Sequence, residues 1–481
     1  LESNIVVLTT GTYMDSCRMV SATVTPGGPD NEPTTKNLSE SLRKLGIKLF
    51  RLKTGTPARV LTSSIDFSKT SLEEGSKRFI RFSEDTREDE VRSIEEQMPC
   101  YLTYTTEKTK EIVLANLNKS SMYSGVVKGV GPRYCPSFED KIVRFSDKER
   151  HQLFLEPLDA TNELTYVQGF STSMPYDVQE EMVHSVIGLE NCKIIKYAYA
   201  IEYDAIDPLQ VKASLEMKDI DGLFIGGQIL GTSGYEEAAG LGMMAGINAL
   251  RKLNNKEPLV LKRDEAYIGV MIDDLVTKGT KEPYRLLTSR AEYRLLMRHD
   301  NAENRLIKYG HENGLISEKR YQRYLDKVDQ MNSLVTYLKN SKVDYSTGIG
   351  EYLNGLGFEE DSMKSFNAYE LVKRPGVECS EVLRFLGNDS YDDELIFNTQ
   401  IEIRYEGYIQ KARKEADKML KMDGMKLPQD IDYSKVDNLR LEARQKLNQV
   451  KPFTLGQASR ISGINPADLN VLAVYIKEHK I

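Results

Sequence analysis

The stretch from Gly222 to Ala249 constrains the fold more than any other part of this sequence. Three apolar residues, Leu223 to Ile225, predict a short buried strand, and the paired glycines Gly226 and Gly227 follow it. After a polar, glycine-containing turn, a helix is predicted to start near Tyr235. In this geometry, backbone N–H groups and the helix dipole can meet the anionic or polar edge of a cofactor. A tightly packed strand–helix corner without a ligand is the alternative at this point.

The predicted helix carries Glu236 and Glu237 in its first turn. Small residues recur on one of its faces, so another backbone can approach closely. These small residues are Ala238, Gly242, Ala245, Gly246 and Ala249.

Composition narrows the class of protein. A chain of 481 residues is long enough for two to four domains with sizeable cores. With 40% hydrophobic and 28% charged residues, it matches soluble globular proteins. No apolar run approaches the roughly 20 residues of a membrane span. The net charge of -7 argues against general polyanion binding, but it allows a local basic patch.

Cysteine usage indicates the compartment. The five cysteines are scattered, odd in number and never spaced as a CxxC pair. We therefore expect a reducing cytoplasm, with neither a disulfide framework nor a zinc site. The cysteines are Cys17, Cys100, Cys135, Cys192 and Cys379.

The order of patterns along the chain predicts an interrupted α/β domain. Residues 4–12 are typical of a parallel strand that is apolar on both faces, and Arg51 to Arg59 reads as strand, turn and proline exit. A mixed unit separates these segments from the strand at Leu223, and helical patterns dominate after Pro258. The predicted parts are residues 1–61 and 220–257 (α/β domain), 62–219 (inserted domain) and 258–481 (helical domain).

Several single elements are predicted within these parts. A helix is expected from Ser39 to Leu45, and the alternation of Tyr197, Tyr199, Ile201 and Tyr203 predicts a strand. In the helical part, the expected helices cover residues 317–338 with Ser317 as N-cap, residues 405–420, and a last helix beginning at Pro466.

The segment from Gly131 to Phe145 carries the most chemistry. Cys135 lies between Arg133 and Pro136, and Ser137 with Asp140 fits a helix-capping box. A nearby guanidinium and a helix N-terminus would lower the pKa of this thiol and make it more nucleophilic. The alternative is a small residue packed under a proline loop, since no histidine base adjoins it.

Two groups of cations are candidate contacts for anions. Lys53 and Arg59 flank a glycine turn and suit a phosphate or carboxylate, although solvated charges are the alternative. Between Lys281 and Arg305, four arginines accompany tyrosines, and the last three are four residues apart, which predicts one helix face. Such a stripe suits RNA phosphates and bases, unless it pairs with Glu282, Glu292, Asp300 and Glu303. The arginines are Arg285, Arg290, Arg294 and Arg298.

Seven of these stretches together resemble the MnmG/GidA family, the flavoproteins that modify the wobble uridine of bacterial and organellar tRNAs. They are LTTGT, RLKTGTPAR, MYSGVVKGVGPRYCPSFEDK, GGQILGTSGYEEAAGLGMMAGINA, EPYRLLTSRAEYRLLMRHDNAENRL, YEGYIQKA and PFTLGQASRISGINPADL. The resemblance runs from Asn4 to the last predicted helix, in the order of the family.

The resemblance implies an α/β FAD-binding domain of the Rossmann-like, glutathione-reductase type. An inserted α+β, NADH-associated domain and a C-terminal all-helical domain would complete the fold. It also implies a homodimer that acts on tRNA with the GTPase MnmE and adds a (carboxymethyl)aminomethyl group to uridine C5. Methylenetetrahydrofolate would donate the carbon, and FAD reduced by NADH would take part.

Site residues carried over from the family are expectations of the same kind. Cys135 would attack uridine C6, and the four arginines named above would contact tRNA. FAD would contact Gly226, Gly227, Gln228, Glu236 and Ser39. The NAD-associated segment would comprise Gly131, Pro132, Arg133, Tyr134, Pro136, Ser137, Phe138, Glu139, Asp140, Lys141, Ile142, Val143, Arg144 and Phe145.

One departure qualifies this expectation. The family opens with a glycine-rich fingerprint that holds the FAD pyrophosphate, and no such motif occurs here, so we expect an incomplete FAD domain. Two other functions stay open: a folate-dependent tRNA uracil methyltransferase flavoprotein, which lacks such a helical tail, and a non-catalytic protein that binds tRNA or MnmE without FAD.

Overall fold

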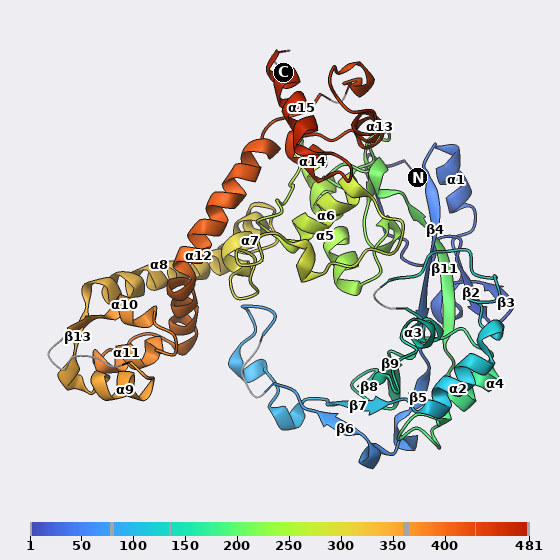
Figure 1. The fold of residues 1–481 in the computed structure, drawn as a ribbon, viewed down its shortest axis with the longest axis horizontal. Helices are drawn as coiled ribbons and strands as arrows, with labels where there is room; N and C mark the ends of the chain where they lie inside the picture. Colours follow the sequence, from blue (N-terminus) through green and yellow to red (C-terminus); the bar gives the residue numbers. More distant parts are fainter. Residues whose placement is uncertain (1, 77–80, 134–135, 359–364, 429, 479–481) are drawn as a thin grey trace. The chain divides into compact units, whose positions relative to one another are not determined.

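The computed structural model describes residues 2–76, 81–133, 136–358, 365–428 and 430–478 (Figure 1). Its internal contacts divide the chain into two compact units. The first unit comprises residues 1–259 and 279–285, and the second comprises residues 260–278 and 286–481. The predicted change of character at Pro258 thus lies two residues before the second unit begins.

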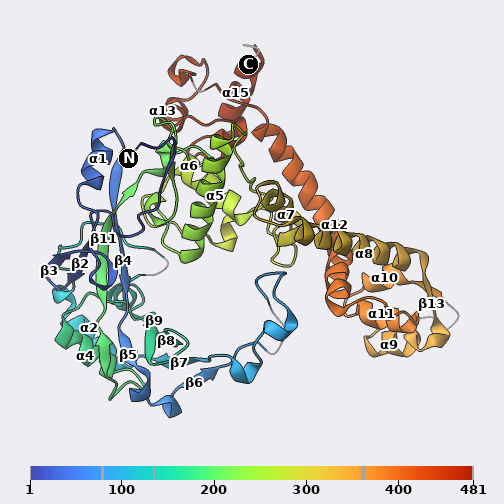
Figure 2. The same ribbon diagram turned by 180° about the vertical axis from the view of Figure 1, so that it is seen from behind.

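A four-stranded antiparallel sheet of the first unit has the order β3-β2-β11-β4. Its strands are β2 (Cys17–Val20), β3 (Thr23–Pro26), β4 (Leu49–Thr56) and β11 (Tyr199–Ile206). β11 is buried from Ala200 onward and pairs with β4 along its whole length, from Tyr199 opposite Thr56 to Ile206 opposite Leu49. Figure 2 shows these two long strands running together. The predicted strand around Tyr203 is therefore a central strand of this sheet.

A six-stranded sheet of the same unit has the order β10-β5-β9-β8-β7-β6 and is covered by three helices. Phe138 and Ile142 from one helix, Val113 from another and Met182 from the third share a core with the strand residue Leu155. The strands are β5 (Arg59–Leu61), β6 (Ser71–Glu73), β7 (Cys100–Tyr104), β8 (Gln152–Pro157), β9 (Leu164–Gln168) and β10 (Ile194–Lys196). The helices are α2 (Glu107–Ala115), α3 (Phe138–Arg144) and α4 (Tyr176–His184).

Two strands pair with strands on the other side of the predicted boundaries at residues 61 and 219. β5 lies in the predicted first segment but pairs with β9 and β10, whereas β11 lies in the predicted insert but pairs with β2 and β4. Strand pairing is set by register between residues far apart in sequence, and composition along the chain does not report it.

A separate parallel pair consists of β1 (Val6–Leu8) and β12 (Leu223–Ile225), next to helix α5 (Tyr235–Leu253). The predicted strand at Leu223 and the helix start at Tyr235 are correct. The expectation that the first strand is buried on both faces is wrong, because Val6 and Val7 are 49% and 38% exposed. Within the described residues, β12 is the only strand that pairs with β1. Helix α1 (Leu38–Lys44) agrees with the prediction for residues 39–45.

The second unit is mainly helical. Its longest helices are α8, capped by the Ser317 hydroxyl as predicted, and α12, which covers the predicted residues 405–420. The last helix begins at Pro466, also as predicted. The helices are α6 (Tyr267–Lys278), α7 (Ala302–Glu312), α8 (Glu318–Asn340), α9 (Ile349–Gly355), α10 (Ala368–Val372), α11 (Cys379–Phe385), α12 (Asp393–Asp423), α13 (Leu441–Val450), α14 (Leu455–Arg460) and α15 (Pro466–Glu478).

The expectation of an all-helical C-terminal domain needs one correction. The antiparallel pair β13 (Lys342–Asp344) and β14 (Ser365–Asn367) lies within this unit. The alternation of side chains along each strand turns Val343 and Phe366 inward, where both are buried in one core with Leu334 and Leu338 of α8. Three-residue strands of this kind leave little periodic signal in a sequence.

A buried ionic cluster joins α6 to α14 inside the second unit. Arg263 is buried and donates hydrogen bonds to Asp273 (3.1 Å) and Asp274 (2.8 Å) of α6. Arg460 of α14 donates to both carboxylate oxygens of Asp273, at 2.6 and 2.8 Å. Because a buried charge is costly without partners, these contacts must form together.

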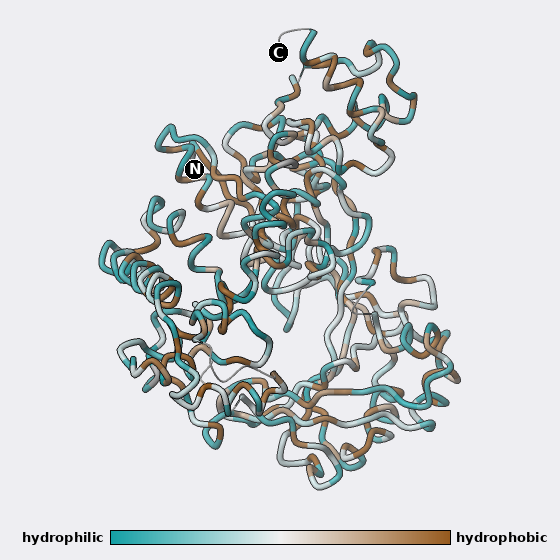
Figure 3. Tube along the Cα trace, turned by 60° about the vertical axis from the view of Figure 1, so that its left-hand side comes forward, coloured by the Kyte–Doolittle hydropathy of each residue, from teal (hydrophilic) through white to brown (hydrophobic). Residues whose placement is uncertain are grey.

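In the part of the chain that the structure describes, no helix has the length and apolar character needed to cross a membrane. Figure 3 agrees with this finding, since its hydrophobic stretches are short and alternate with hydrophilic ones.

The contact between Gly226 and α5 generates a prediction about stability. A Cβ added at Gly226 would lie 3.0 Å from Gly242 Cα and 3.2 Å from Ala245 Cβ, whereas a Cβ added at Gly242 would meet nothing within 4 Å. Gly226→Ala should therefore lower the free energy of unfolding by about 1–3 kcal/mol. Gly242→Ala, inside a helix, should be neutral or raise it by up to about 1 kcal/mol. Denaturant unfolding of both variants measures this difference, and equal stabilities would contradict the packing described.

Candidate cofactor corner and basic cavity

The corner after β12 is held by a hydrogen bond between two polar side chains. Gln228 opens the short helical turn η8 (Gln228–Leu230), and its Nε2 donates to the Tyr203 hydroxyl of β11 at 3.2 Å. Tyr203 is fully buried, and burial raises its pKa to about 12, so it remains a neutral phenol. Gly227 and Gly231, on either side of the turn, have φ values of +78° and +89°. The backbone there adopts conformations that favour glycine.

Buried hydroxyl groups mark the region between this turn and α5. Thr232 Oγ1 and Ser233 Oγ are buried, and neither has a hydrogen-bond partner within the described residues. The same holds for the hydroxyl of Ser39, a predicted cofactor residue on α1. Buried polar groups are normally paired, so unpaired ones of this kind mark places where a polar ligand can bind.

Carboxylates occupy the N-terminus of α5. Glu237 is buried in the first turn and lies 3.2 Å from Arg285, whereas Glu236 is exposed. Negative charge at a helix N-terminus already matches the helix dipole. This end of the helix is therefore better suited to a neutral polar ligand edge than to a pyrophosphate.

A second feature of the first unit is a cavity of about 280 Å³ beside the segment predicted to be chemically active. Lys53 of β4 is only 4% exposed, and it lines the cavity together with residues of this segment. The lining residues are Lys53, Met122, Val130, Gly131, Pro132, Arg133, Pro136, Ser137, Asp140, Arg144 and Glu282. Three cations and two carboxylates thus surround the cavity, which suits an anionic or polar ligand.

Glu202 of β11 positions the backbone of Lys128 and Gly129, which leads into this cavity. The buried carboxylate oxygen Oε1 accepts hydrogen bonds from the backbone N–H groups of Lys128 and Gly129, both at 2.5 Å. The backbone N–H of Lys53 donates to the carbonyl of Val130 at 3.0 Å. These contacts bring Gly131 next to β4, a proximity that no local pattern in the sequence indicates.

The predicted NAD-associated segment divides into three groups. Seven of its residues line the cavity, as stated above. Phe138, Glu139 and Ile142 are buried in the unit, and the Lys141 ammonium donates to the Gly169 carbonyl at 2.8 Å. The remaining residues are exposed (Val143 and Phe145) or lie outside the described residues (Tyr134 and Cys135).

The helix expected after Cys135 is present as α3, but the expected capping box is not formed. Ser137 is the N-cap residue, and its hydroxyl is buried without a hydrogen-bond partner among the described residues. Asp140 instead accepts a hydrogen bond from the Tyr123 hydroxyl at 3.0 Å. Burial, with this carboxylate, raises the Tyr123 pKa to about 12.

The expectation that Arg290, Arg294 and Arg298 share one helix face is wrong. The chain forms the 3-10 turn η9 (Thr288–Arg290) and then turns, so no regular helix aligns them. Arg298 donates to Asp300 at 2.9 Å and pairs with Glu402 of α12, whereas Arg294 is exposed. The ion-paired alternative is therefore correct for Arg298.

Comparison with known proteins identifies the family. Residues 1–257 match the family described as glucose inhibited division protein A. Residues 318–413 and 415–481 match the helical domain and the helical bundle of the C-terminus of the tRNA modifying enzyme MnmG/GidA. The chain belongs to the MnmG/GidA family.

Individual MnmG/GidA proteins resemble the chain over nearly its whole length. The tRNA uridine 5-carboxymethylaminomethyl modification enzyme MnmG of Mycoplasma mycoides is 50% identical over 479 residues, which are 99% of this chain and 76% of that protein. The enzyme of the same name from Listeria monocytogenes is 50% identical over 477 residues, or 99% and 75%. Aquifex aeolicus GidA in its form II crystal has a TM-score of 0.87 at 42% identity, covering 98% of this chain and 74% of that one.

The MnmG/GidA fold, mixed α/β followed by a helical C-terminus, is thus the fold of this chain. The two C-terminal matches cover the helical tail that the sequence predicts. Sequence reasoning singled out Gln228 and the 131–145 segment, but it missed Met122, Val130 and Glu282 as cavity residues. Among the described residues, no cluster of three or more His, Cys, Asp or Glu side chains is arranged to hold a metal ion.

The turn that precedes β12 depends on Glu216. Burial alone would raise the pKa of this carboxyl, but hydrogen bonds from Lys252, from the Gly222 N–H and from Lys212 lower it to about 2. Because the folded-state pKa lies below the usual 4.5, the stabilisation is complete above pH 4.5 and is lost as the pH falls toward 2.

We predict that Glu216→Gln lowers the free energy of unfolding by about 2 kcal/mol at pH 7. The difference from the wild-type protein should shrink as the pH falls from 4.5 toward 2, in urea unfolding followed by circular dichroism. Glu40→Gln, which removes an exposed carboxylate paired with Lys44, is the control and should change stability little. A pH-independent effect of Glu216→Gln would show that its charge does not contribute.

Proposed function

We propose that this protein carries out the tRNA uridine 5-carboxymethylaminomethyl modification for which its relatives are named. Identity of about half over nearly the whole chain supports this proposal, because it extends through the α/β part and both C-terminal helical parts. The observation that carries it is the cavity in which buried Lys53 lies beside the 131–145 segment.

We further propose that β1, β12 and α5 belong to a Rossmann-like FAD-binding domain and that the six-stranded sheet belongs to an NADH-associated insert. The corner fits a flavin ring edge, since Gln228 can present its amide and the Thr232 and Ser233 hydroxyls are buried without partners. Glu236 and Ser39 are candidate contacts for the same cofactor. Bound FAD would supply the redox chemistry by which a carbon from methylenetetrahydrofolate reaches the uridine.

The protein's own residues have the following proposed roles. The Cys135 thiolate adds to C6 of the uridine, and the electron pair of the C5–C6 double bond moves to C5, which becomes nucleophilic. After C5 has bonded to the donated carbon, loss of the C5 proton and of the thiolate restores the double bond. Lys53, Arg133 and Arg144 line the cavity beside the described residues of the 131–145 segment, and positive charges near a thiol favour its thiolate form.

The proposed partners follow from the family. We propose that the protein acts as a homodimer in the cytoplasm with the GTPase MnmE, and that tRNA is its substrate. The C-terminal helical domain, residues 258–481, is the proposed contact region for tRNA and MnmE, and it includes both C-terminal parts that match the family.

If Cys135 is the nucleophile, its substitution should abolish modification of the uridine without weakening tRNA binding. Cys135→Ser should reduce modification of the wobble uridine at least 1,000-fold, as an order of magnitude for a lost nucleophile, while tRNA affinity changes less than about twofold. Cys100→Ser, a half-buried thiol on β7, is the matched control and should retain activity. Nucleoside analysis of the reacted tRNA measures modification by both variants, and a binding titration measures their tRNA affinity. Wild-type activity in Cys135→Ser would remove this thiol from the mechanism.

The arginines differ in their expected contribution to tRNA binding. Arg294 is exposed, so Arg294→Ala should weaken tRNA binding and lower the slope of log K against log salt by about 0.7–0.9. Arg298→Ala should change the slope less and the stability more, because Arg298 is already paired with Asp300 and Glu402. Titrations at several salt concentrations test this order, and an unchanged slope for Arg294→Ala would contradict it.

A further inference from the structure

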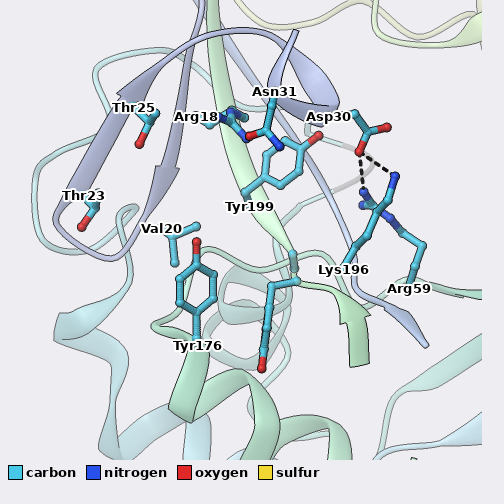
Figure 4. Close-up of a pocket in the computed structure, with 12 residues that line it drawn as sticks. Arg18, Val20, Thr23, Thr25, Asp30, Asn31, Arg59, Tyr176, Lys196 and Tyr199 are labelled. Carbon is cyan, nitrogen blue, oxygen red and sulfur yellow. Dashed lines mark hydrogen bonds and ion pairs between the residues drawn. The ribbon is translucent and has the colours of Figure 1, made fainter. Parts of the chain in front are cut away.

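A second cavity of the first unit, about 520 Å³ in volume, is separate from the one lined by Lys53. It lies beside strands β2, β3, β10 and β11 and the start of α4, and Figure 4 shows its side chains. None of its lining residues is a glycine, so side chains rather than a glycine-rich backbone cradle form its wall.

The cavity has an excess of positive charge. Arg18, Arg59 and Lys196 line it, and Asp30 is the only carboxylate among its lining residues. Two positive charges are therefore left without a matching negative charge in the wall of this cavity. Arg59 is only 6% exposed, and its guanidinium is fixed by hydrogen bonds to Thr56 Oγ1 (3.0 Å) and the Pro57 carbonyl (3.1 Å).

Two of the cations converge on one oxygen atom. Lys196 Nζ lies 3.0 Å and Arg59 Nη2 lies 3.2 Å from the same carboxylate oxygen, Oδ1 of Asp30 (Figure 4). Asp30 and Asn31 have φ values of +49° and +70°, a left-handed conformation that costs energy for residues other than glycine. Arg18 holds the Asn31 side chain. The loop thus places an oxyanion at a point that two cations already favour, which is the position a phosphate oxygen would take.

Three tyrosines, Tyr176, Tyr197 and Tyr199, line the same cavity as these cations. Tyr176, at the start of α4, is 55% exposed, and its ring centroid lies 4.7 Å from that of Tyr197. The Arg59 guanidinium lies 6.0 Å from the ring centroid of Tyr199. Exposed aromatic faces beside arginine and lysine side chains are the arrangement by which proteins bind single-stranded nucleic acid, with the base stacked and the phosphate paired.

We propose that this cavity binds one nucleotide of single-stranded RNA, with its phosphate at Arg59 and Lys196 and its base against Tyr176. The proposal deepens the proposed function, on which it rests, by assigning a contact site for the RNA substrate. Asp30 is the intramolecular substitute for the phosphate. Its side chain is 56% exposed, so exchange for a phosphate costs little.

Two variants with opposite expected effects test the proposal. Lys196→Gln removes a phosphate contact, and it should weaken tRNA binding about fivefold at 0.1 M salt and lower the salt slope by about 0.7. Asp30→Asn removes the negative charge that competes with the RNA phosphate for Arg59 and Lys196. It should therefore tighten tRNA binding about threefold. A gain in affinity cannot result from misfolding. Lys44→Gln, which removes an exposed cation paired with Glu40 on α1, is the control and should leave both quantities within twofold.

Fluorescence anisotropy with labelled tRNA gives these values, and AMP serves as a free-nucleotide competitor. Weaker binding by Lys196→Gln together with tighter binding by Asp30→Asn supports the proposal. If both variants behave like Lys44→Gln, or if only AMP binding responds to them, the site is not an RNA contact. Wobble-uridine modification by the wild-type protein is measured separately, so that failure of the enzymatic function is distinguishable from failure of this site.

Discussion

The buried carboxylate of Glu202 is the interaction on which the arrangement of the first unit depends. A buried charge is tolerated only when it is paired and hydrogen-bonded, and Glu202 meets this demand with two backbone N–H groups and the Arg51 guanidinium at 3.4 Å. The N–H groups belong to Lys128 and Gly129, so the electrostatic requirement of one side chain on β11 fixes the backbone that leads into the Lys53 cavity. Lys53 is also the residue opposite Glu202 in the sheet register.

The next two residues of β11 also position groups from other elements. Tyr203 holds Gln228 at the glycine corner, and Asp204 accepts a hydrogen bond from Arg43 of α1 at 2.7 Å. Because side chains alternate along a strand, one short segment can orient groups on both faces of the sheet. The corner proposed for FAD and the cavity proposed for catalysis therefore share one rigid support, and a distortion of β11 would disturb both.

Features that depend on interactions between neighbouring residues can be predicted from the sequence. Features that depend on contacts between residues far apart in the sequence cannot. The strand at Leu223, the helix start at Tyr235, the Ser317 cap and the helix at Pro466 depend on neighbouring residues, and all four are correct. The prediction of an arginine stripe is wrong, because residues 288–298 form a 3-10 turn and further turns instead of a helix. The pairing of Arg298 with Asp300 was one of the alternatives, whereas its pairing with Glu402, 104 positions further along the chain, gives no local signal. The contact of Lys53 with Val130 and the pairing partners of β5 and β11 were missed because they also join residues far apart in the sequence. Catalytic chemistry at Cys135 is still a proposal from the sequence alone.

The arginines also show why counting cations is a poor guide to RNA contacts. Arg298 has two carboxylate partners, so binding a phosphate would require breaking interactions that are already favourable. Arg59 and Lys196 instead share the single carboxylate of Asp30, and that carboxylate is half exposed. Local shortage of carboxylates, rather than abundance of arginine, is what creates a binding site for an anion. A protein with a net charge of -7 can therefore bind a polyanion at a few places while the rest of its surface repels it.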